Sequence, residues 1–218
     1  MTADGGEGDG EKSRFRCLDA ARYVFAAAVT VLIMVVVVNA IKVVLRPESL
    51  QLSVAGGSLS TAQLKPPPEE VLGVELNLRA QNPSGRSRMY YLNIRAYLFD
   101  KNTSASASSK PEYESIITFI PSDIAVVQQE AVDSLVSMKL KKRQVDPSYF
   151  GMLYNGSRFS DMTLRLDGDL ITEVTSEFNK TRPTSYYCEQ LLVGGKNSDD
   201  EPVKYRQDVI CKQRGALN

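Results

Sequence analysis

The hydrophobic pattern opens with one long apolar run near the N-terminus. The nineteen residues from Tyr23 to Ile41 carry no charge and are bounded by Arg22 and Lys42. As an α-helix this run rises about 28 Å, close to the roughly 30 Å hydrocarbon core of a bilayer. The alternatives are a buried core helix, a buried valine-rich strand, which usually spans about 4–8 residues, and a cleavable signal peptide, whose apolar stretch is usually about 7–15 residues. We therefore predict a retained transmembrane signal anchor over residues 23–45.

The charges that flank the run predict its orientation. Four basic residues precede it and two follow it closely: Lys12, Arg14, Arg16 and Arg22, then Lys42 and Arg46. The positive-inside rule then places the N-terminus in the cytosol. The sequence predicts a disordered cytosolic tail over residues 1–22, rich in glycine and acidic residues at its start, and an extracellular or lumenal domain over residues 46–218.

The rest of the chain alternates apolar and polar residues with a period of two. The segment from Val74 to Gln81 alternates almost without error, which is typical of a half-buried strand. Similar patterns predict further strands at 49–54, 90–99, 115–120, 132–141, 160–174, 186–193 and 203–211. Short alternating strands separated by turns favour an antiparallel two-sheet β-sandwich of about seven or eight strands.

One short helix interrupts this pattern. Asp146 and Pro147 stand where a helix N-cap and a first helical residue are expected.

Composition excludes several kinds of chemistry. The chain has no histidine, which excludes triads and metal sites that require imidazole. Its 26 basic and 26 acidic side chains give no net charge and no basic surface for nucleic acid. We expect no catalytic residue, no cofactor and no metal. Asp161, Asp167 and Asp169 lack the spacing of an EF-hand, so calcium is the weaker interpretation of these three aspartates.

Three sequons in the predicted external domain present acceptor asparagines for N-glycosylation, at Asn102, Asn155 and Asn179. The proline of Asn82-Pro83-Ser84 excludes a fourth. We expect at least one of the three to carry a glycan.

The cysteines divide between the two sides of the predicted membrane. Cys188 and Cys211 fall on predicted neighbouring strands of the external domain, and a pair in an oxidising compartment favours one disulfide, with two free buried thiols as the alternative. Cys17 lies in the cytosolic tail near the bilayer, where a thiol is either palmitoylated or unmodified.

A turn follows the strand predicted at 74–81. Asn82 can bond nearby backbone, Pro83 stops the strand ladder, and Gly85 tolerates a positive φ. A structural hinge is the favoured interpretation, and a recognition loop is the alternative. The basic run Lys139–Arg143 is interpreted in the same way, as a solvated strand end with an anionic partner as the alternative.

The stretch VELNLRAQNPSGRSRMYYLNIRAYLFD, Val74–Asp100, resembles the group-2 late embryogenesis abundant (LEA-2) domain. With the short tail and the anchor, the chain is similar to plant harpin-induced-like, non-race-specific disease resistance-like membrane proteins. Their hallmark is a strand ending in Asn-Pro, here Asn82-Pro83, and then a Tyr-containing strand. Ser84 replaces the second asparagine that is commonest in the family. The resemblance implies an immunoglobulin- or fibronectin-III-like sandwich, the plasma membrane or another secretory-pathway membrane, a role in stress or defence, and no catalytic residues.

These observations predict a non-enzymatic, single-span membrane protein whose external domain binds an unidentified protein partner at the cell surface. The alternative is a sandwich that binds or transfers a lipid through an apolar cavity of roughly 300 Å³ or more between its sheets. A hydrolase that uses serine or carboxylates is a third hypothesis, which the missing histidine disfavours.

Overall fold

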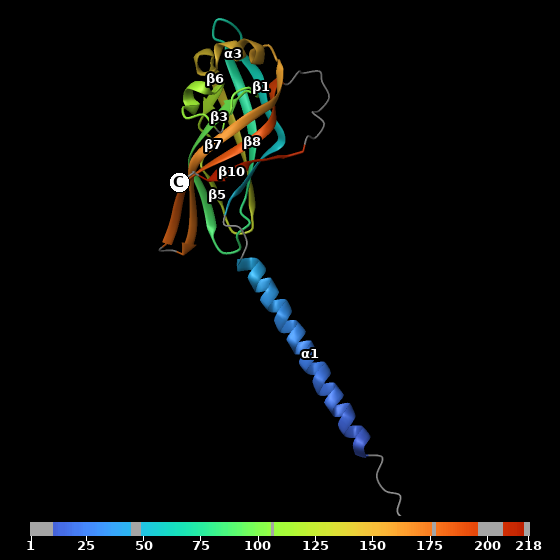
Figure 1. The fold of residues 1–218 in the computed structure, drawn as a ribbon. Coiled ribbons are helices and arrows are strands. Elements are labelled where there is room, and N and C mark those ends of the chain that lie inside the picture. Colours follow the sequence, from blue (N-terminus) through green and yellow to red (C-terminus); the bar gives the residue numbers. More distant parts are fainter. Residues whose placement is uncertain (1–10, 45–48, 106, 176–177, 196–206, 216–218) are drawn as a thin grey trace, which may run out of the picture. The chain divides into compact units, whose positions relative to one another are not determined.

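The computed structural model describes residues 11–44, 49–105, 107–175, 178–195 and 207–215. The chain divides into two compact units, Met1–Arg46 and Pro47–Asn218 (Figure 1).

The first unit is a single helix, α1 (Glu11–Val44). Its stretch Ala20–Lys42 is long and apolar enough to span a membrane, with a mean hydropathy of 2.8, and none of it is buried within the structure. The helix begins at Glu11, upstream of the apolar run, so it includes residues 11–22 of the predicted tail and with them Cys17. Leucine, alanine, arginine and lysine in this stretch are good helix formers, and they extend the helix from the apolar segment. Residues 1–10 of the predicted tail lie outside the described residues.

The second unit is mainly β. Its strands are β1 (Gln51–Lys65), β2 (Val71–Gln81), β3 (Arg88–Phe99), β4 (Ile117–Phe119), β5 (Ile124–Val126), β6 (Ala131–Lys141), β7 (Arg158–Thr175), β8 (Phe178–Gly195), β9 (Val209–Ile210) and β10 (Lys212–Gly215). Three short helices accompany them: α2 (Pro111–Glu114), the 3-10 helix η1 (Lys142–Gln144) and α3 (Pro147–Tyr154). Residues 203–206 of the last predicted strand lie outside the described residues. Within the rest of that prediction only β9 is a strand, and β10 follows after its end at residue 211.

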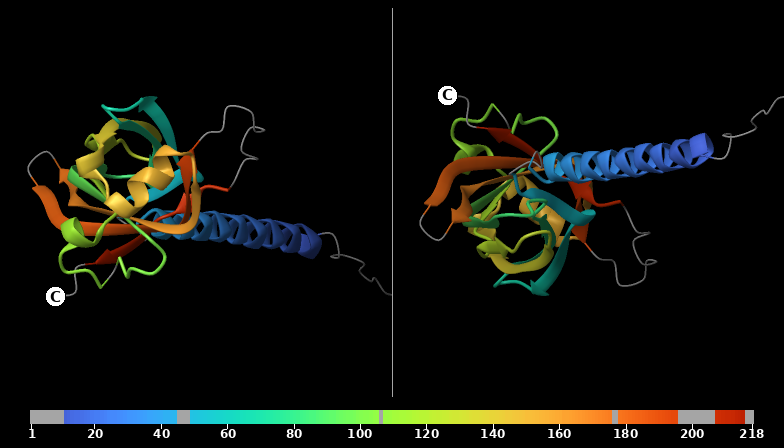
Figure 2. Two further views of the ribbon diagram at one scale, coloured as in Figure 1. Left: turned by 90° about the horizontal axis from the view of Figure 1, so that it is seen from above. Right: turned by 90° about the horizontal axis from the view of Figure 1, so that it is seen from below.

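All of these strands belong to one hydrogen-bonded sheet, ordered β4-β3-β7-β8-β1-β2-β6. Every pairing is antiparallel except that between β1 and β8, where Ser58–Thr61 run parallel to Leu192–Gly195. The expected pair of separate antiparallel sheets is therefore corrected to one mixed sheet. Its two arms, β1-β2-β6 and β8-β7-β3 with β4 and β5, curl around a common interior (Figure 2).

The parallel pairing of β1 with β8 depends on a bend in β1. Gly56 and Gly57 have φ of 66° and 56°, which β-strand residues with side chains rarely adopt. The register of β1 against β2 shifts between Val54 and Leu59, as a β-bulge requires. Beyond this bulge β1 leaves β9 and pairs with β8, so the glycine pair directs the strand from one neighbour to another.

The C-terminal strand fills the space that β1 and β8 leave before they meet. In β9, Val209 and Ile210 pair with β1, and in β10, Lys212–Gly215 pair with β8. Between them the Cys211 amide donates to the Leu52 carbonyl at 2.8 Å. The segment 209–215 thus joins the two arms along the part of the sheet where β1 and β8 are not in contact.

The interior is one cluster of buried apolar side chains contributed by both arms, including Leu52, Leu78, Leu98 and Leu164. Helix α3 lies across one end of the curled sheet (Figure 2) and buries Phe150 and Leu153. The prediction of this helix is confirmed, because Asp146 Oδ1 accepts a hydrogen bond from the Ser148 amide at 2.8 Å and Pro147 follows the cap.

Two buried tyrosines of the β8-β7-β3 arm meet inside this core, and Tyr186 bonds across to Leu50, the residue before β1. Their rings meet edge to face with centroids 5.4 Å apart. The Tyr91 hydroxyl on β3 lies 2.8 Å from the Leu166 carbonyl and 3.0 Å from the Thr184 carbonyl. The Tyr186 hydroxyl on β8 donates to the Leu50 carbonyl at 2.8 Å. Burial raises the pKa of both phenols above the ordinary value for tyrosine.

These phenols predict an alkaline limit to stability. Because the folded-state pKa values of Tyr91 and Tyr186 are raised, their contribution is complete below the unfolded pKa of about 10 and is lost as the pH rises above it. In a spectrophotometric titration, we expect two of the ten tyrosines to ionise only as the circular dichroism of the sheet disappears. Ionisation of all ten while the sheet signal stays native would contradict this expectation.

Candidate binding groove

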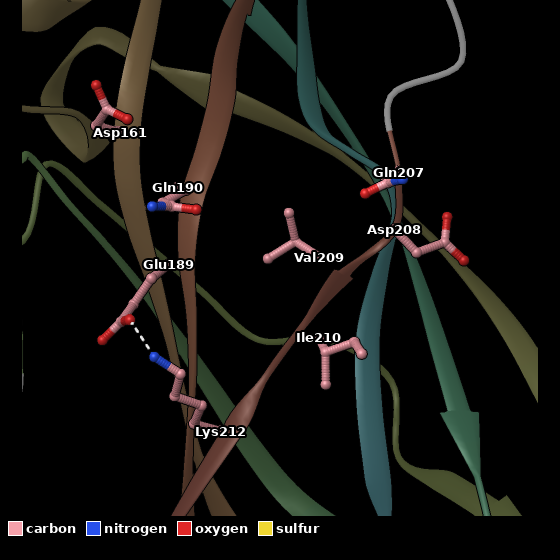
Figure 3. A pocket seen from close by; sticks show the side chains of 8 residues that line it. All are labelled: Asp161, Glu189, Gln190, Gln207, Asp208, Val209, Ile210 and Lys212. Atoms are coloured by element: carbon pink, nitrogen blue, oxygen red, sulfur yellow. Dashed lines mark hydrogen bonds and ion pairs between the residues drawn. The ribbon is translucent and has the colours of Figure 1, made fainter.

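A groove of about 820 Å³ lies where β1 and β8 diverge. Its lining comes from β7, β8 and the C-terminal segment: Asp161, Glu189, Gln190, Gln207, Asp208, Val209, Ile210 and Lys212. Figure 3 shows Glu189 and Gln190 on β8 across the groove from Val209 and Ile210, with Asp161 on the neighbouring strand. Residues that are distant in sequence therefore form a single surface.

Gly57 allows the C-terminal segment to reach the rim of the groove. A Cβ on this glycine would stand 3.0 Å from the Gln207 carbonyl oxygen and 3.0 Å from Val209 Cγ2, closer than side chains normally approach. The missing side chain therefore lets segment 207–209 pass beside β1.

Two residues of the groove have a strained backbone. Asp161 has φ 62° and Gln190 φ 64°, a left-handed conformation that costs most residues about 1–2 kcal/mol. Both lie where the β7–β8 register shifts, between the paired positions Phe159–Val193 and Leu164–Cys188. Such bulges redirect side chains away from the regular alternation of a strand.

The three carboxylates of the groove differ in their partners, and the Arg79 guanidinium beside Asp208 is also bound by Asp133 at 2.8 Å. Glu189 Oε2 accepts from Lys212 Nζ at 2.8 Å. Asp208 accepts from the Gly56 amide at 2.9 Å and lies 3.3 Å from an Arg79 guanidinium nitrogen. Asp161 accepts from the Ser160 hydroxyl at 3.1 Å and faces no cation among the ion pairs of the described residues.

A smaller depression of about 330 Å³ continues the groove. It shares Asp161, Glu189 and Gln190 with the first and extends along the loop Lys101–Ala105. The sequon residue Asn102 is exposed within this loop, between two lining residues. The other acceptors, Asn155 at the C-terminal cap of α3 and Asn179 on β8, are also exposed.

Asn82 is fully buried, and its side chain connects three segments. Its amide nitrogen donates to the Ser87 carbonyl at 2.8 Å and to the Val126 carbonyl at 3.2 Å, and its Oδ1 accepts from the Ser84 amide at 2.9 Å. The side chain thus ties the end of β2 to the start of β3 and to β5. Burial favours the hinge interpretation over a recognition loop at Asn82.

Gly85 tolerates a positive φ but does not adopt one in this turn. The left-handed glycines in the described part of the chain are Gly56, Gly57, Gly156 and Gly194. Hydrogen bonds from the Asn82 and Ser84 side chains fix the turn, so it needs no positive φ at Gly85.

Cys188 and Cys211 are joined by a disulfide with Cα atoms 4.1 Å apart, and both residues are buried. The bond connects β8 to the C-terminal segment beside the groove. Cys17 lies within α1, and its side chain is outside the description.

The other predicted clusters do not assemble into a site. Among the residues that the structure describes, no group of three His, Cys, Asp or Glu side chains is placed to hold a metal ion. Asp167 pairs with Arg165 at 2.9 Å, and Asp169 accepts from Asn93 at 3.0 Å. In the basic run Lys139–Arg143, Lys142 pairs with Glu70 at 3.1 Å beside an open depression of about 400 Å³.

No protein-family model and no curated protein matches the sequence. Among solved structures, one similar chain is described as a crystal structure of a protein from Archaeoglobus fulgidus. It is 9% identical and covers 62% of this chain and 94% of its own, with a TM-score of 0.29. A similarity this low supports no inference about function.

The groove could not be recognised from the sequence. Gln190 and Asp208 carry no motif, and the segments that hold them meet only through pairings distant in sequence. The usable signal was Gly56-Gly57, which interrupts an alternating strand and so indicates a bulge.

Asn82→Ala tests the buried connection. The substitution removes both donors and one acceptor and leaves buried backbone groups unsatisfied, so we expect the free energy of unfolding to fall by about 2–4 kcal/mol. Urea denaturation of the full chain in detergent, followed by tyrosine fluorescence, measures this change. Asn77→Ala, on the same strand, is the matched control and should shift the midpoint little; equal shifts for the two variants would refute the role of Asn82.

Replacing both Cys188 and Cys211 by serine should loosen the C-terminal strand more than the rest of the sheet. A cross-link of this span contributes about 3 kcal/mol in the chain-entropy model. Hydrogen exchange with mass spectrometry should show faster exchange at 209–215 and little change in β3. Alkylation of both thiols in unreduced native protein would instead establish the free-thiol alternative.

Proposed function

We propose that this protein is a single-span membrane protein whose β-domain, outside the cytosol, binds a partner without catalysis. The observation that carries this proposal is that a helix of membrane-spanning length precedes, in the chain, a β unit that has a buried apolar core and an open groove. The resemblance of Val74–Asp100 to the LEA-2 domain supports a plasma-membrane or secretory-pathway location and a role in plant stress or defence. The two arms of the sheet would then correspond to the two layers of the immunoglobulin- or fibronectin-III-like sandwich that this resemblance implies.

Orientation with the N-terminus in the cytosol is supported by two independent features. Basic residues are more numerous before the apolar run than after it. The Cys188–Cys211 disulfide belongs to an oxidising compartment. The three exposed sequons would then be accessible to glycosylation.

A non-catalytic role is supported by composition and by the groove. Histidine is absent, which excludes imidazole as a general base or nucleophile partner, and the Glu189 carboxylate in the groove is held by Lys212 at 2.8 Å.

Lipid binding or transfer is the alternative, and it needs an open apolar cavity between the arms. The apolar side chains of both arms form one contiguous buried cluster. The depressions near Lys142, Asp161 and Ile210 are open to solvent and lined mainly by polar or charged residues. A binding role at the surface of the domain fits this arrangement better.

Proximity labelling in native membranes tests the proposal. With the labelling enzyme fused to the C-terminus, we expect secreted and cell-surface proteins to be enriched, and an elicitor to change that set. The same enzyme fused to the N-terminus is the control and should label cytosolic proteins.

Two results would contradict the proposal. Enrichment of the same cytosolic proteins by both fusions would place the domain in the cytosol. A stoichiometric lipid recovered by mass spectrometry from the purified protein, and lost on mutation of core residues, would favour the lipid carrier.

A further inference from the structure

The groove between β8 and the C-terminal segment presents groups that match hydroxyl-rich ligands. The carboxamides of Gln190 and Gln207 each offer donors and an acceptor, and both residues are exposed. A sugar hydroxyl also donates and accepts. Ile210 is 75% exposed beside them and provides an apolar surface for the C–H face of a sugar ring.

Charge in the groove disfavours an anionic ligand. Glu189 is paired with Lys212, whereas Arg79 is shared between Asp133 and Asp208, so Asp208 and Asp161 keep carboxylate oxygens that repel phosphate and other anions. Sugar hydroxyls can donate to these carboxylates as well as to the carboxamides. A lysine-rich peptide is the competing ligand, and the experiment below includes it.

The strained positions strengthen this argument. Glycine would adopt the φ of 62° and 64° at Asp161 and Gln190 without cost, yet both positions carry polar side chains that line the groove. An observed backbone outlier of this kind is a reason to seek a function for the side chain.

We propose that this groove binds a neutral oligosaccharide. This inference deepens the proposed function, because it names the chemistry of a ligand for the same external domain. The oligosaccharide has two possible sources, a separate glycan or the N-glycan of Asn102, whose neighbours Lys101 and Thr103 line the continuation of the groove.

Gln190→Gly is the decisive variant. It removes the carboxamide and also relieves the left-handed backbone, so loss of binding cannot be attributed to misfolding if the melting temperature is retained. Gln129→Gly is the matched control, because Gln129 has φ 59° in the turn between β5 and β6 and does not line the groove.

The first experiment uses full-length Asn102→Gln protein in phosphatidylcholine nanodiscs, and its binding is measured on an array of short neutral hexose and pentose oligosaccharides. Acidic oligosaccharides and a lysine-rich peptide are the comparison ligands. For a separate glycan, we expect binding of a neutral oligosaccharide that Gln190→Gly weakens about tenfold, as the loss of one or two hydrogen bonds implies, and Gln129→Gly leaves unchanged.

The second experiment uses protein with Asn102 intact and measures how fast an endoglycosidase releases the glycan under native conditions. If the Asn102 glycan occupies the groove, Gln190→Gly should accelerate its release about tenfold, the same loss of binding, and Gln129→Gly should not. Glycans at Asn155 and Asn179 serve as internal controls.

The proposal is overturned if Gln190→Gly changes neither array binding nor glycan release, or if only acidic sugars or the basic peptide bind. Those results leave the external interaction role intact. A different pair of results would reject the proposed function itself. These are the absence of a glycan from all three sequons in protein from native membranes and the labelling of cytosolic proteins by the C-terminal fusion.

Discussion

Backbone pairing of the C-terminal segment 209–215 between β1 and β8 is the constraint on which this domain depends. Along the part of the sheet where those two strands are apart, hydrogen bonds from this segment make the two arms continuous, and the Cys188–Cys211 bond holds it there. Without it, the edges of both strands would have unpaired backbone groups beside the core. The groove lies at the same junction, so the bend at Gly56-Gly57 serves both the closure of the sheet and the site.

The alternation of apolar and polar residues predicted much of this architecture, because it shows directly which side chains of a strand are buried. The predicted strand at 74–81 lies within β2, and the Asp146 cap begins α3. The order of the strands in the sheet could not be predicted from this alternation, because pairs such as Ser58 and Leu192 are distant in sequence. For the same reason alternation favoured two antiparallel sheets where one mixed sheet is observed.

The candidate site illustrates the same limit. Asn82 was recognisable as a turn residue from its proline neighbour, but its burial and its bond to the Val126 carbonyl come from tertiary packing. Gln190 and Asp161 are ordinary polar residues in sequence, and only their left-handed backbone and shared groove distinguish them. Side-chain chemistry therefore became informative only after the strands had been placed.

The proposed anchor, the disulfide, the sequons and the proposed oligosaccharide site form a consistent account only if the β-domain lies outside the cytosol. Protease protection in sealed microsomes that contain the full-length protein tests this most directly. The account predicts that the domain resists added protease until detergent opens the vesicles, while an epitope tag on the N-terminus is removed at once. Digestion of the domain in intact vesicles, with the N-terminal tag protected, would contradict it.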